Sequence, residues 1–201
     1  MKPTTIGFWQ GRLPHWEVED GRYFVTVRLR GAIPKVGRDR IREKSDELRN
    51  VDRHNEEEVL KIQRSIFKEM EHWLHRSERV KYLENEKVAQ MIIEAVEHRQ
   101  QECIWNMFEY VVMPNHLHLF FETGDGHIKK VMEDFKHWTA IQANRLLERE
   151  GRLWQTEWFD HWSRSDAESE KIVRYIQQNP QAAGLIQEGE VWPYVGHGRR
   201  P

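Results

Sequence analysis

Two histidines spaced two residues apart are the side chains of this 201-residue chain best suited to carry out chemistry. They are His116 and His118, and Leu117 and Leu119 alternate with them. Because successive side chains of a strand point to opposite faces, both imidazoles leave one face and the leucines pack on the other. Converging neutral imidazoles can bind a divalent metal ion if a third ligand and open coordination positions are present. The spacing of the two histidines also allows a second interpretation, in which both are simply solvated or hydrogen-bonded.

A tyrosine and an asparagine further along the chain are a second candidate pair. Asn179 follows Tyr175 by four residues, so the two side chains lie on the same face of a predicted helix. A tyrosine hydroxyl can act as a nucleophile, and an amide oxygen can be a ligand of a hard cation. The alternative is a tyrosine that packs half-buried at the edge of an apolar helix face.

The composition limits the partners that this chain can have. A net charge of -2 argues against a strongly basic, nonspecific nucleic-acid binder, although 31 Lys and Arg residues allow a local basic groove. Cys103 is the only cysteine, which excludes an intrachain disulfide and a thiolate zinc site and fits a reducing compartment. No apolar run reaches membrane-spanning length, and the N-terminus lacks the apolar region of a signal peptide. We therefore expect a cytoplasmic protein without a membrane partner.

Hydrophobic periodicity predicts the strands and helices that would position these residues. Alternating and β-branched runs predict strands at 22–30, 104–113, 116–122 and 154–162. Apolar residues at three- and four-residue spacing predict helices at about 59–73, 86–98, 128–151 and 165–179. The break at Pro114-Asn115 indicates that the two strands beside it are antiparallel neighbours.

The predicted ends of two helices rest on single residues. Gly151 is the expected C-cap of the helix that begins near residue 128. Ser165 and Glu168 form a capping box that would begin the last helix. Asn179-Pro180 should end that helix, because proline pushes the residue before it out of the helical region.

The segment 35–58 is almost entirely charged, with few apolar anchors. It is interpreted as an exposed, mobile insertion, with a short solvated helix as the alternative. The remaining order is strand, helices, strand, strand, helix, strand, helix. This order favours one α+β domain over 1–201, a ferredoxin-like βαββαβ sandwich with an antiparallel sheet and a C-terminal helix that carries the tyrosine.

Two strings of residues resemble the signatures of a known family. Val112-Met113-Pro114-Asn115-His116-Leu117-His118 and Tyr175-Ile176-Gln177-Gln178-Asn179-Pro180 resemble the motifs of single-tyrosine HUH transposases, above all the REP-associated tyrosine transposases. Arg12-Leu13-Pro14-His15-Trp16, and the stretch from Trp154 to Arg164, are also similar to those proteins. The resemblance runs from about residue 12 to 192.

The resemblance implies a ferredoxin-like domain in which His116 and His118 bind Mg²⁺ or Mn²⁺ and Tyr175 is the nucleophile. In related insertion-sequence enzymes a glutamine four residues after the tyrosine completes the metal site. Asn179 stands at that spacing here, with Gln178 as the fallback. Phe24 occupies a first-strand position where many relatives have a histidine, so no third histidine is expected from that strand.

The activity that the resemblance implies is cleavage and rejoining of single-stranded DNA at hairpin-forming repeats, through a 5′-phosphotyrosine intermediate and without a nucleotide cofactor. Lys129, Lys136 and Arg164 are the candidate DNA contacts. Two alternatives stay open: a non-catalytic regulatory protein that binds DNA hairpins, and a metal-dependent phosphodiesterase that uses water. We expect a monomer, as REP-associated relatives tend to be.

Overall fold

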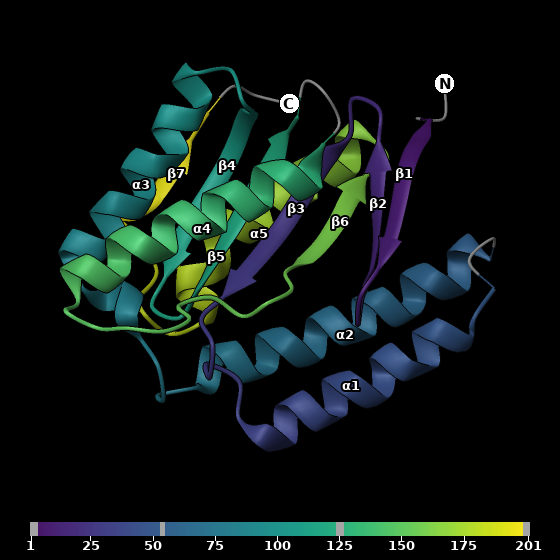
Figure 1. Cartoon of the computed structure of the whole chain (residues 1–201), viewed down its shortest axis with the longest axis horizontal. Helices are drawn as coiled ribbons and strands as arrows, with labels where there is room; N and C mark the ends of the chain where they lie inside the picture. The colour runs from purple at the N-terminus through teal and green to yellow at the C-terminus, as the bar shows by residue number, and fades with distance from the viewer. Residues whose placement is uncertain (1–3, 53–54, 124–126, 199–201) are drawn as a thin grey trace.

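The computed structural model describes residues 4–52, 55–123 and 127–198. A five-stranded sheet with the order β6-β3-β5-β4-β7 forms its centre (Figure 1), and every neighbouring pair is antiparallel. The strands are β3 (Arg22–Arg28), β4 (Asn106–Met113), β5 (His116–Glu122), β6 (Phe159–Ser163) and β7 (Val195–His197). Apart from the edge strand β7, this is the ferredoxin-like order, so the predicted α+β sandwich is confirmed.

Helices cover both faces of this sheet. Helices α3 (Glu86–Gln101) and α4 (Ile128–Leu146) lie on one face, and α5 (Asp166–Ala182) lies on the other (Figure 1). Helices α1 (Lys35–Asn50) and α2 (Glu56–Arg76) form an antiparallel pair at the bottom of that view. In the described residues, no helix is long and apolar enough to cross a membrane.

Alternation along the central strand β5 assigns each side chain to a layer. Phe121 packs against Trp105, with ring centroids 5.0 Å apart, and Trp105 packs on Phe135 of α4. His116 and His118 point to the opposite face, which α5 covers. Because β5 is a central strand, both of its faces are buried, and the histidines are therefore shielded from bulk water.

A two-stranded hairpin, β1 (Thr5–Gln10) and β2 (Pro14–Val18), precedes the sheet and was not predicted. Strand β1 is largely exposed and lacks a run of buried residues, so its sequence carries little strand signal. The hairpin is fixed to the main sheet by a buried contact between His15 of β2 and Asp160 of β6.

The prediction of a mobile connection at 35–58 is wrong where the structure describes α1 and the beginning of α2; residues 53–54 lie outside the described residues. The alternative of a helix is correct, and α1 is longer than expected. Its buried side is a narrow stripe at helical spacing, formed by Gly37, Ile41, Ser45 and Leu48. This stripe packs on α2. Two large apolar residues, with small residues between them, are therefore enough to hold α1 against α2.

Several predicted boundaries are also corrected. Helix α4 ends at Leu146 rather than near Gly151. The strand predicted from Trp154 begins only at Phe159, because Trp154 makes a single bridge to Leu29 before the chain leaves the sheet.

Helix α5 continues through Pro180 to Ala182. Proline is tolerated there because it lies in the last turn and removes only one hydrogen bond. Gly184 follows the C-cap Ala183, and its φ of 72° is left-handed, which prevents the helix from continuing. Leu185 N–H donates to the Pro180 carbonyl and Gly184 N–H to the Gln181 carbonyl, both at 2.9 Å, which is a Schellman motif.

The cap predicted at the start of α5 is present, with one difference. Ser165 accepts a hydrogen bond from the Glu168 N–H at 3.2 Å, as predicted. The Glu168 carboxylate reaches back to the N–H of Arg164 at 2.8 Å, one residue before the cap. The cap fixes the beginning of the helix that carries Tyr175.

Candidate active site

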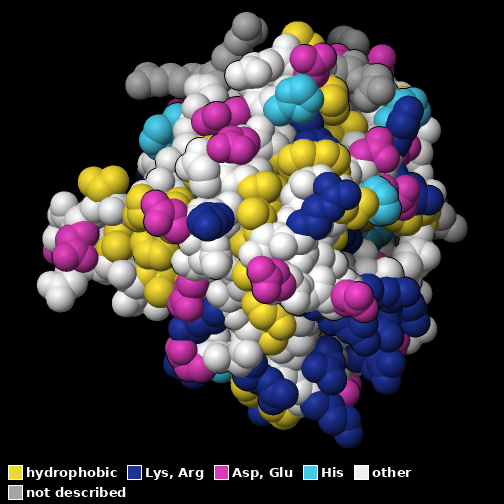
Figure 2. All heavy atoms as spheres, turned by 60° about the vertical axis from the view of Figure 1, so that its left-hand side comes forward, with side chains coloured by type: hydrophobic (Ala, Val, Ile, Leu, Met, Phe, Trp, Pro, Cys, Tyr) yellow, Lys and Arg dark blue, Asp and Glu magenta, His cyan; other side chains and the backbone are white. Residues whose placement is uncertain are grey.

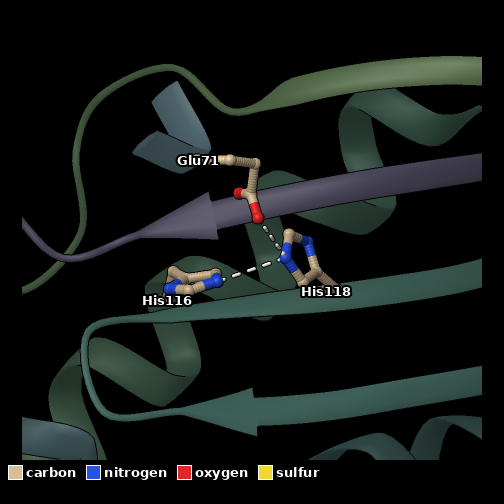
Figure 3. Close-up of side chains that lie close together, drawn as sticks. All are labelled: Glu71, His116 and His118. Atoms are coloured by element: carbon tan, nitrogen blue, oxygen red, sulfur yellow. Dashed lines mark hydrogen bonds and ion pairs between the residues drawn. The ribbon is translucent and has the colours of Figure 1, made fainter. Parts of the chain in front are cut away.

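His116 and His118 face each other across a short gap on β5, with their Nε2 atoms 3.2 Å apart (Figure 3). Their Nδ1 atoms are held by neighbours: that of His118 lies 2.9 Å from the Thr26 hydroxyl, and that of His116 lies 2.7 Å from Oδ1 of Asn115. An amide oxygen only accepts, so Nδ1 of His116 carries the proton, and the same assignment for His118 leaves both Nε2 lone pairs facing the gap. Such partners orient imidazoles that bind metals.

Glu71 of α2 is the third member of this group. Its Oε2 lies 3.4 Å from Nε2 of His118 (Figure 3). The ligand atoms of Glu71, His116 and His118 all lie within 4.8 Å of one another, and the three residues are buried. Sequence reasoning missed Glu71. The available signal was its place on the buried stripe of α2, where an unpaired carboxylate would be costly.

These residues fit a divalent cation. Two nitrogens at about 2.1 Å from a metal, in neighbouring positions at right angles, would be about 3 Å apart, close to the 3.2 Å seen. Two buried oxygens, Glu71 Oε1 and Asn179 Oδ1, have no hydrogen-bond partner in the described residues. Buried acceptors without a donor are costly, and a cation would satisfy them.

Tyr175 joins the same group from α5. Its hydroxyl donates a hydrogen bond to Oε2 of Glu71. Nδ2 of Asn179 donates to the Tyr175 hydroxyl at 3.0 Å and to Glu71 Oε2 at 3.2 Å. The structure thus brings together the four predicted residues, His116, His118, Tyr175 and Asn179. Gln178, the fallback amide, is exposed and points elsewhere on the helix.

Burial sets the protonation of the group. It lowers the pKa of His116 to about 3, with a further contribution from His118, so this imidazole is neutral and can bind metal at neutral pH. It raises the pKa of Tyr175 far above its usual value, and the adjacent Glu71 carboxylate adds to this. Burial alone would raise the pKa of Glu71, but His118, His75 and His116 together hold it well below its usual value. The tyrosine is therefore protonated and the carboxylate ionised.

Phe24 of β3 fills the position beside the histidines. Its ring stacks on His118, with centroids 5.2 Å apart, and meets Tyr175 edge-on at 5.7 Å. As the sequence predicted, β3 contributes no histidine to the group. Phe24 instead forms an apolar wall that separates the group from the adjoining cavity.

A cavity of about 530 Å³ opens on the side of Tyr175 away from the histidines. It is lined by Phe24, Leu60, Gln63, Arg64, Phe67, Phe159, His161, Arg164, Ser165, Ala167, Glu168, Lys171, Ile172 and Tyr175. Of the three predicted DNA contacts, only Arg164 lines this cavity. Its guanidinium also stacks over Trp162 at 4.0 Å.

The other two predicted DNA contacts lie elsewhere. Lys136 donates to the Thr156 carbonyl at 2.6 Å and covers the Trp158 ring. Burial, with the nearby Arg28, lowers its pKa to about 8. Lys129 lies 5.9 Å from the centroid of the Trp9 ring. Neither is part of the group around Tyr175.

A second cavity, of about 210 Å³, gathers four arginines. Arg12, Arg28, Arg38 and Arg42 line it together with one carboxylate, Glu157. Within the described residues none of these arginines forms an ion pair. Burial lowers the pKa of Arg28 to about 10, which leaves it charged but poorly solvated at neutral pH.

The arginine cavity lies at the end of the molecule that α1 occupies. Figure 2 shows Lys and Arg side chains gathered low on one face, at the level that α1 and α2 have in Figure 1. Helix α1 alone contributes Lys35, Arg38, Arg40, Arg42, Lys44 and Arg49. The chain therefore has a local basic surface although its overall charge is -2.

Comparisons with known proteins agree on one family. Residues 55–179 match the family model described as "Transposase IS200 like". A Haemophilus influenzae protein, named provisionally as a REP-associated tyrosine transposase, is 28% identical over 109 residues, which are 47% of this chain and 62% of that protein. The match thus spans less than two thirds of that relative.

A solved structure of a REP-associated tyrosine transposase bound to a REP hairpin has a similar fold. The alignment covers 90% of this chain and 79% of that chain, with a TM-score of 0.56 and 17% sequence identity. At this identity the likeness concerns the fold. The family match includes α2, β5 and most of α5, the elements that carry Glu71, the two histidines and Tyr175.

Proposed function

The chain belongs to the IS200-like transposase family, and on that premise we propose that it cleaves and rejoins single-stranded DNA at hairpin-forming repeats, with Tyr175 as the nucleophile. The observation that carries the proposal is the shared buried group, in which the Tyr175 hydroxyl and Nε2 of His118 both contact Oε2 of Glu71. A nucleophile and a metal site that meet at one carboxylate can act on the same phosphodiester.

A bound Mg²⁺ or Mn²⁺ would polarise the scissile phosphate and offset the charge that develops on its oxygens. His116, His118 and Glu71 would hold the ion, and Asn179 offers its free Oδ1 from α5. Thr26 and Asn115 keep the imidazoles turned so that their Nε2 atoms remain available.

Tyr175 performs the covalent step. Its oxygen attacks phosphorus as the bond to the 3′ oxygen breaks, and the 5′ end is left as a phosphotyrosine. The leaving 3′ oxygen takes up a proton from water and departs as a 3′-hydroxyl. The phenolic proton leaves towards the Glu71 carboxylate, which already accepts its hydrogen bond. A second 3′-hydroxyl can attack this ester and rejoin the strands. The energy of the phosphodiester is kept, so no nucleotide cofactor is consumed.

DNA contacts follow from charge and position. Arg164 lies beside the cavity that Tyr175 lines, where it can bind a phosphate next to the cleaved bond. The four arginines of the second cavity offer further phosphate contacts. Lys136 and Lys129 are less favoured as DNA contacts. Lys136 already donates a hydrogen bond to the Thr156 carbonyl. A hairpin is the proposed partner because the similar solved structure is bound to one.

The principal alternative is a non-catalytic protein that binds hairpins on the same fold. A pure binder has no need for a buried group of two histidines, a carboxylate and a tyrosine. Burying such groups costs free energy that only a ligand or a reaction would offset. The geometry therefore favours the enzyme.

A covalent adduct is the direct test. The protein is incubated with a labelled single-stranded hairpin and Mg²⁺ or Mn²⁺ and then analysed on a denaturing gel. We expect a protein–DNA adduct that disappears on chelation and in Tyr175→Phe. It should persist in the control Tyr82→Phe, which removes a hydroxyl from a more exposed tyrosine.

Two outcomes would contradict the proposal. Tight hairpin binding without an adduct in either metal would favour the regulatory protein. Cleaved products without an adduct would indicate a phosphodiesterase that uses water.

A further inference from the structure

The cavity of about 530 Å³ beside Tyr175 has the character of a ligand site. Its volume falls within the roughly 300–1,000 Å³ of typical small-ligand pockets. Its walls come from three parts of the fold: α2, the β3–β6 edge of the sheet, and the N-terminal half of α5. None of the groups proposed to bind metal lines it, so it is a separate compartment beside Tyr175.

The inner walls are aromatic and aliphatic. Phe67 is partly exposed and packs against Phe159 at 5.1 Å and against Tyr175 at 5.5 Å. Leu60 and Ile172 complete the apolar surface. Flat aromatic rings of this kind are the surfaces on which unpaired nucleobases stack.

Gln63 places one amide among the apolar residues that line this cavity. The residue is only 6% exposed, and its side chain lines the cavity. It lies one helical turn before Phe67, on the same face of α2. An amide presents a donor and an acceptor side by side, which matches the edge of a nucleobase.

The rim of the cavity is positively charged. Arg64, Arg164 and Lys171 line it and are exposed to solvent. Glu168, the carboxylate among the lining residues, is already paired with His161 at 2.9 Å. An apolar interior with cations at its mouth suits a base that enters while its backbone phosphates remain outside.

We propose that this cavity binds one unpaired nucleobase of the DNA strand, adjoining the phosphodiester that Tyr175 attacks, stacked on Phe67 and read by Gln63. That the bound base belongs to the DNA strand cleaved by Tyr175 rests on the proposed function. Since Tyr175 lines the cavity and its hydroxyl contacts Glu71, a base held there belongs to a nucleotide that flanks the cleaved bond. The site would give the enzyme a base preference at that nucleotide.

The test is a binding scan that needs no cleavage. Tyr175→Phe is titrated with fluorescent hairpin substrates in which each unpaired nucleotide in turn is made abasic. We expect affinity to fall roughly tenfold or more at one position, the loss of one stacked base. Adducts formed by the wild-type protein then locate the cleaved bond, which should adjoin that position.

Gln63→Leu separates recognition from folding. In the Tyr175→Phe background it should reduce the discrimination among the four bases at that position at least fivefold, and it should leave affinity for the abasic substrate unchanged. Gln90→Leu is the matched control, because Gln90 is exposed on α3, away from the cavity. Phe67→Leu, which keeps the site apolar, should weaken binding of the intact substrate and not of the abasic one.

The outcomes of these experiments test the base-binding cavity and the proposed cleavage activity separately. A wild-type protein that forms the adduct while no abasic position affects binding would overturn the base pocket and keep the proposed function. A position-specific response without any adduct would keep the pocket and overturn the function. An equal effect of Gln63→Leu on intact and abasic substrates would show that Gln63 reads no base. Absence of hairpin binding would overturn both.

Discussion

At the scale of single residues, one hydroxyl governs the orientation of His118. Thr26 is fully buried on β3, opposite His118 in the sheet, and its Oγ1 is 2.9 Å from Nδ1 of that histidine. When Nδ1 donates to this oxygen, Nε2 is left with its lone pair towards His116 and Glu71. Without this contact the ring could turn or change tautomer, and the proposed metal site would lose a ligand.

Thr26→Val should therefore weaken the binding of Mn²⁺ by about 10- to 100-fold, the usual effect of removing such a partner. The substitution preserves shape and removes only the hydroxyl. Isothermal titration calorimetry with Mn²⁺ measures the change. Thr123→Val is a matched control, because Thr123 is equally buried and its hydroxyl has no hydrogen-bond partner among the described residues. An equal loss in both variants would show that the effect is not specific to His118.

Glu71 offers a second prediction at this scale. Glu71→Gln keeps the volume of the side chain and removes its charge, so we expect Mn²⁺ affinity to fall at least about tenfold, as for other losses at a metal site. Asn179→Ala, which removes the amide, should have the smaller effect, because a neutral oxygen contributes less attraction to a cation than a carboxylate does. The same titration compares the two. The opposite ranking would make Asn179 the essential third ligand.

How far the sequence could predict this site depends on which element each residue comes from. His116 with His118 and Tyr175 with Asn179 are local pairs, so strand and helix geometry alone aligns their side chains. Glu71 approaches from α2, and no spacing along the chain places it beside the histidines. Only the packing of α2 against the sheet brings it there.

At the scale of elements, the contact between α1 and α2 depends on the absence of a side chain. A Cβ at Gly37 would lie 2.7 Å from the Trp73 ring and 2.8 Å from Ile33. These are distances that real Cβ atoms do not adopt, and the ring atoms involved are near the Trp73 backbone rather than at a flexible end. Gly37 therefore permits the close packing that holds α2, and Glu71 with it.

Gly37→Ala tests this packing. Helix propensity alone would stabilise α1 by about 1 kcal/mol, but overpacking costs about 1–3 kcal/mol. We expect a net loss in the free energy of unfolding, measured by urea denaturation. In a Trp73→Leu background the same change should cost less, because the ring contact is gone and only the contact with Ile33 remains. A stabilised single variant would show that the helices are not in close contact there.

Elements with a clear period were predicted well, and elements defined by tertiary contacts were not. Strand β5 and helices α2 and α3 carry enough apolar residues to show their period. Helix α1 shows only Ile41 and Leu48 as large anchors, so its charge dominates the pattern. The predicted end of α5 at Asn179-Pro180 lies too early in the chain, because α5 continues through Pro180 to Ala182 and Gly184 follows its C-cap. A proline in the last turn costs little, whereas a left-handed residue ends the helix.

At the scale of the whole molecule, charge is segregated. The arginine cavity and the proposed metal site share strand β3, because Thr26 contacts His118 and Arg28 lines the cavity. Two residues along a strand span about 7 Å, close to the spacing of successive phosphates in a nucleic-acid strand. If a DNA strand bound at Tyr175 also extends to the arginine cavity, its phosphates would meet the arginines there.

This path makes a prediction for the salt dependence of hairpin binding. If Arg38 and Arg42 each bind a phosphate, Arg38→Ala and Arg42→Ala should each reduce the slope of log affinity against log salt by about 1, for all hairpin sequences alike. Neither arginine forms an ion pair in the described residues, so losing its charge leaves no carboxylate of the protein unpaired. Fluorescence titration at several salt concentrations measures the slope. Arg145→Ala, at an exposed position on α4 outside the cavity, should leave it unchanged. Equal slopes for all the variants would place the DNA backbone elsewhere, whereas a loss confined to the cavity arginines would extend the binding surface from Tyr175 to α1.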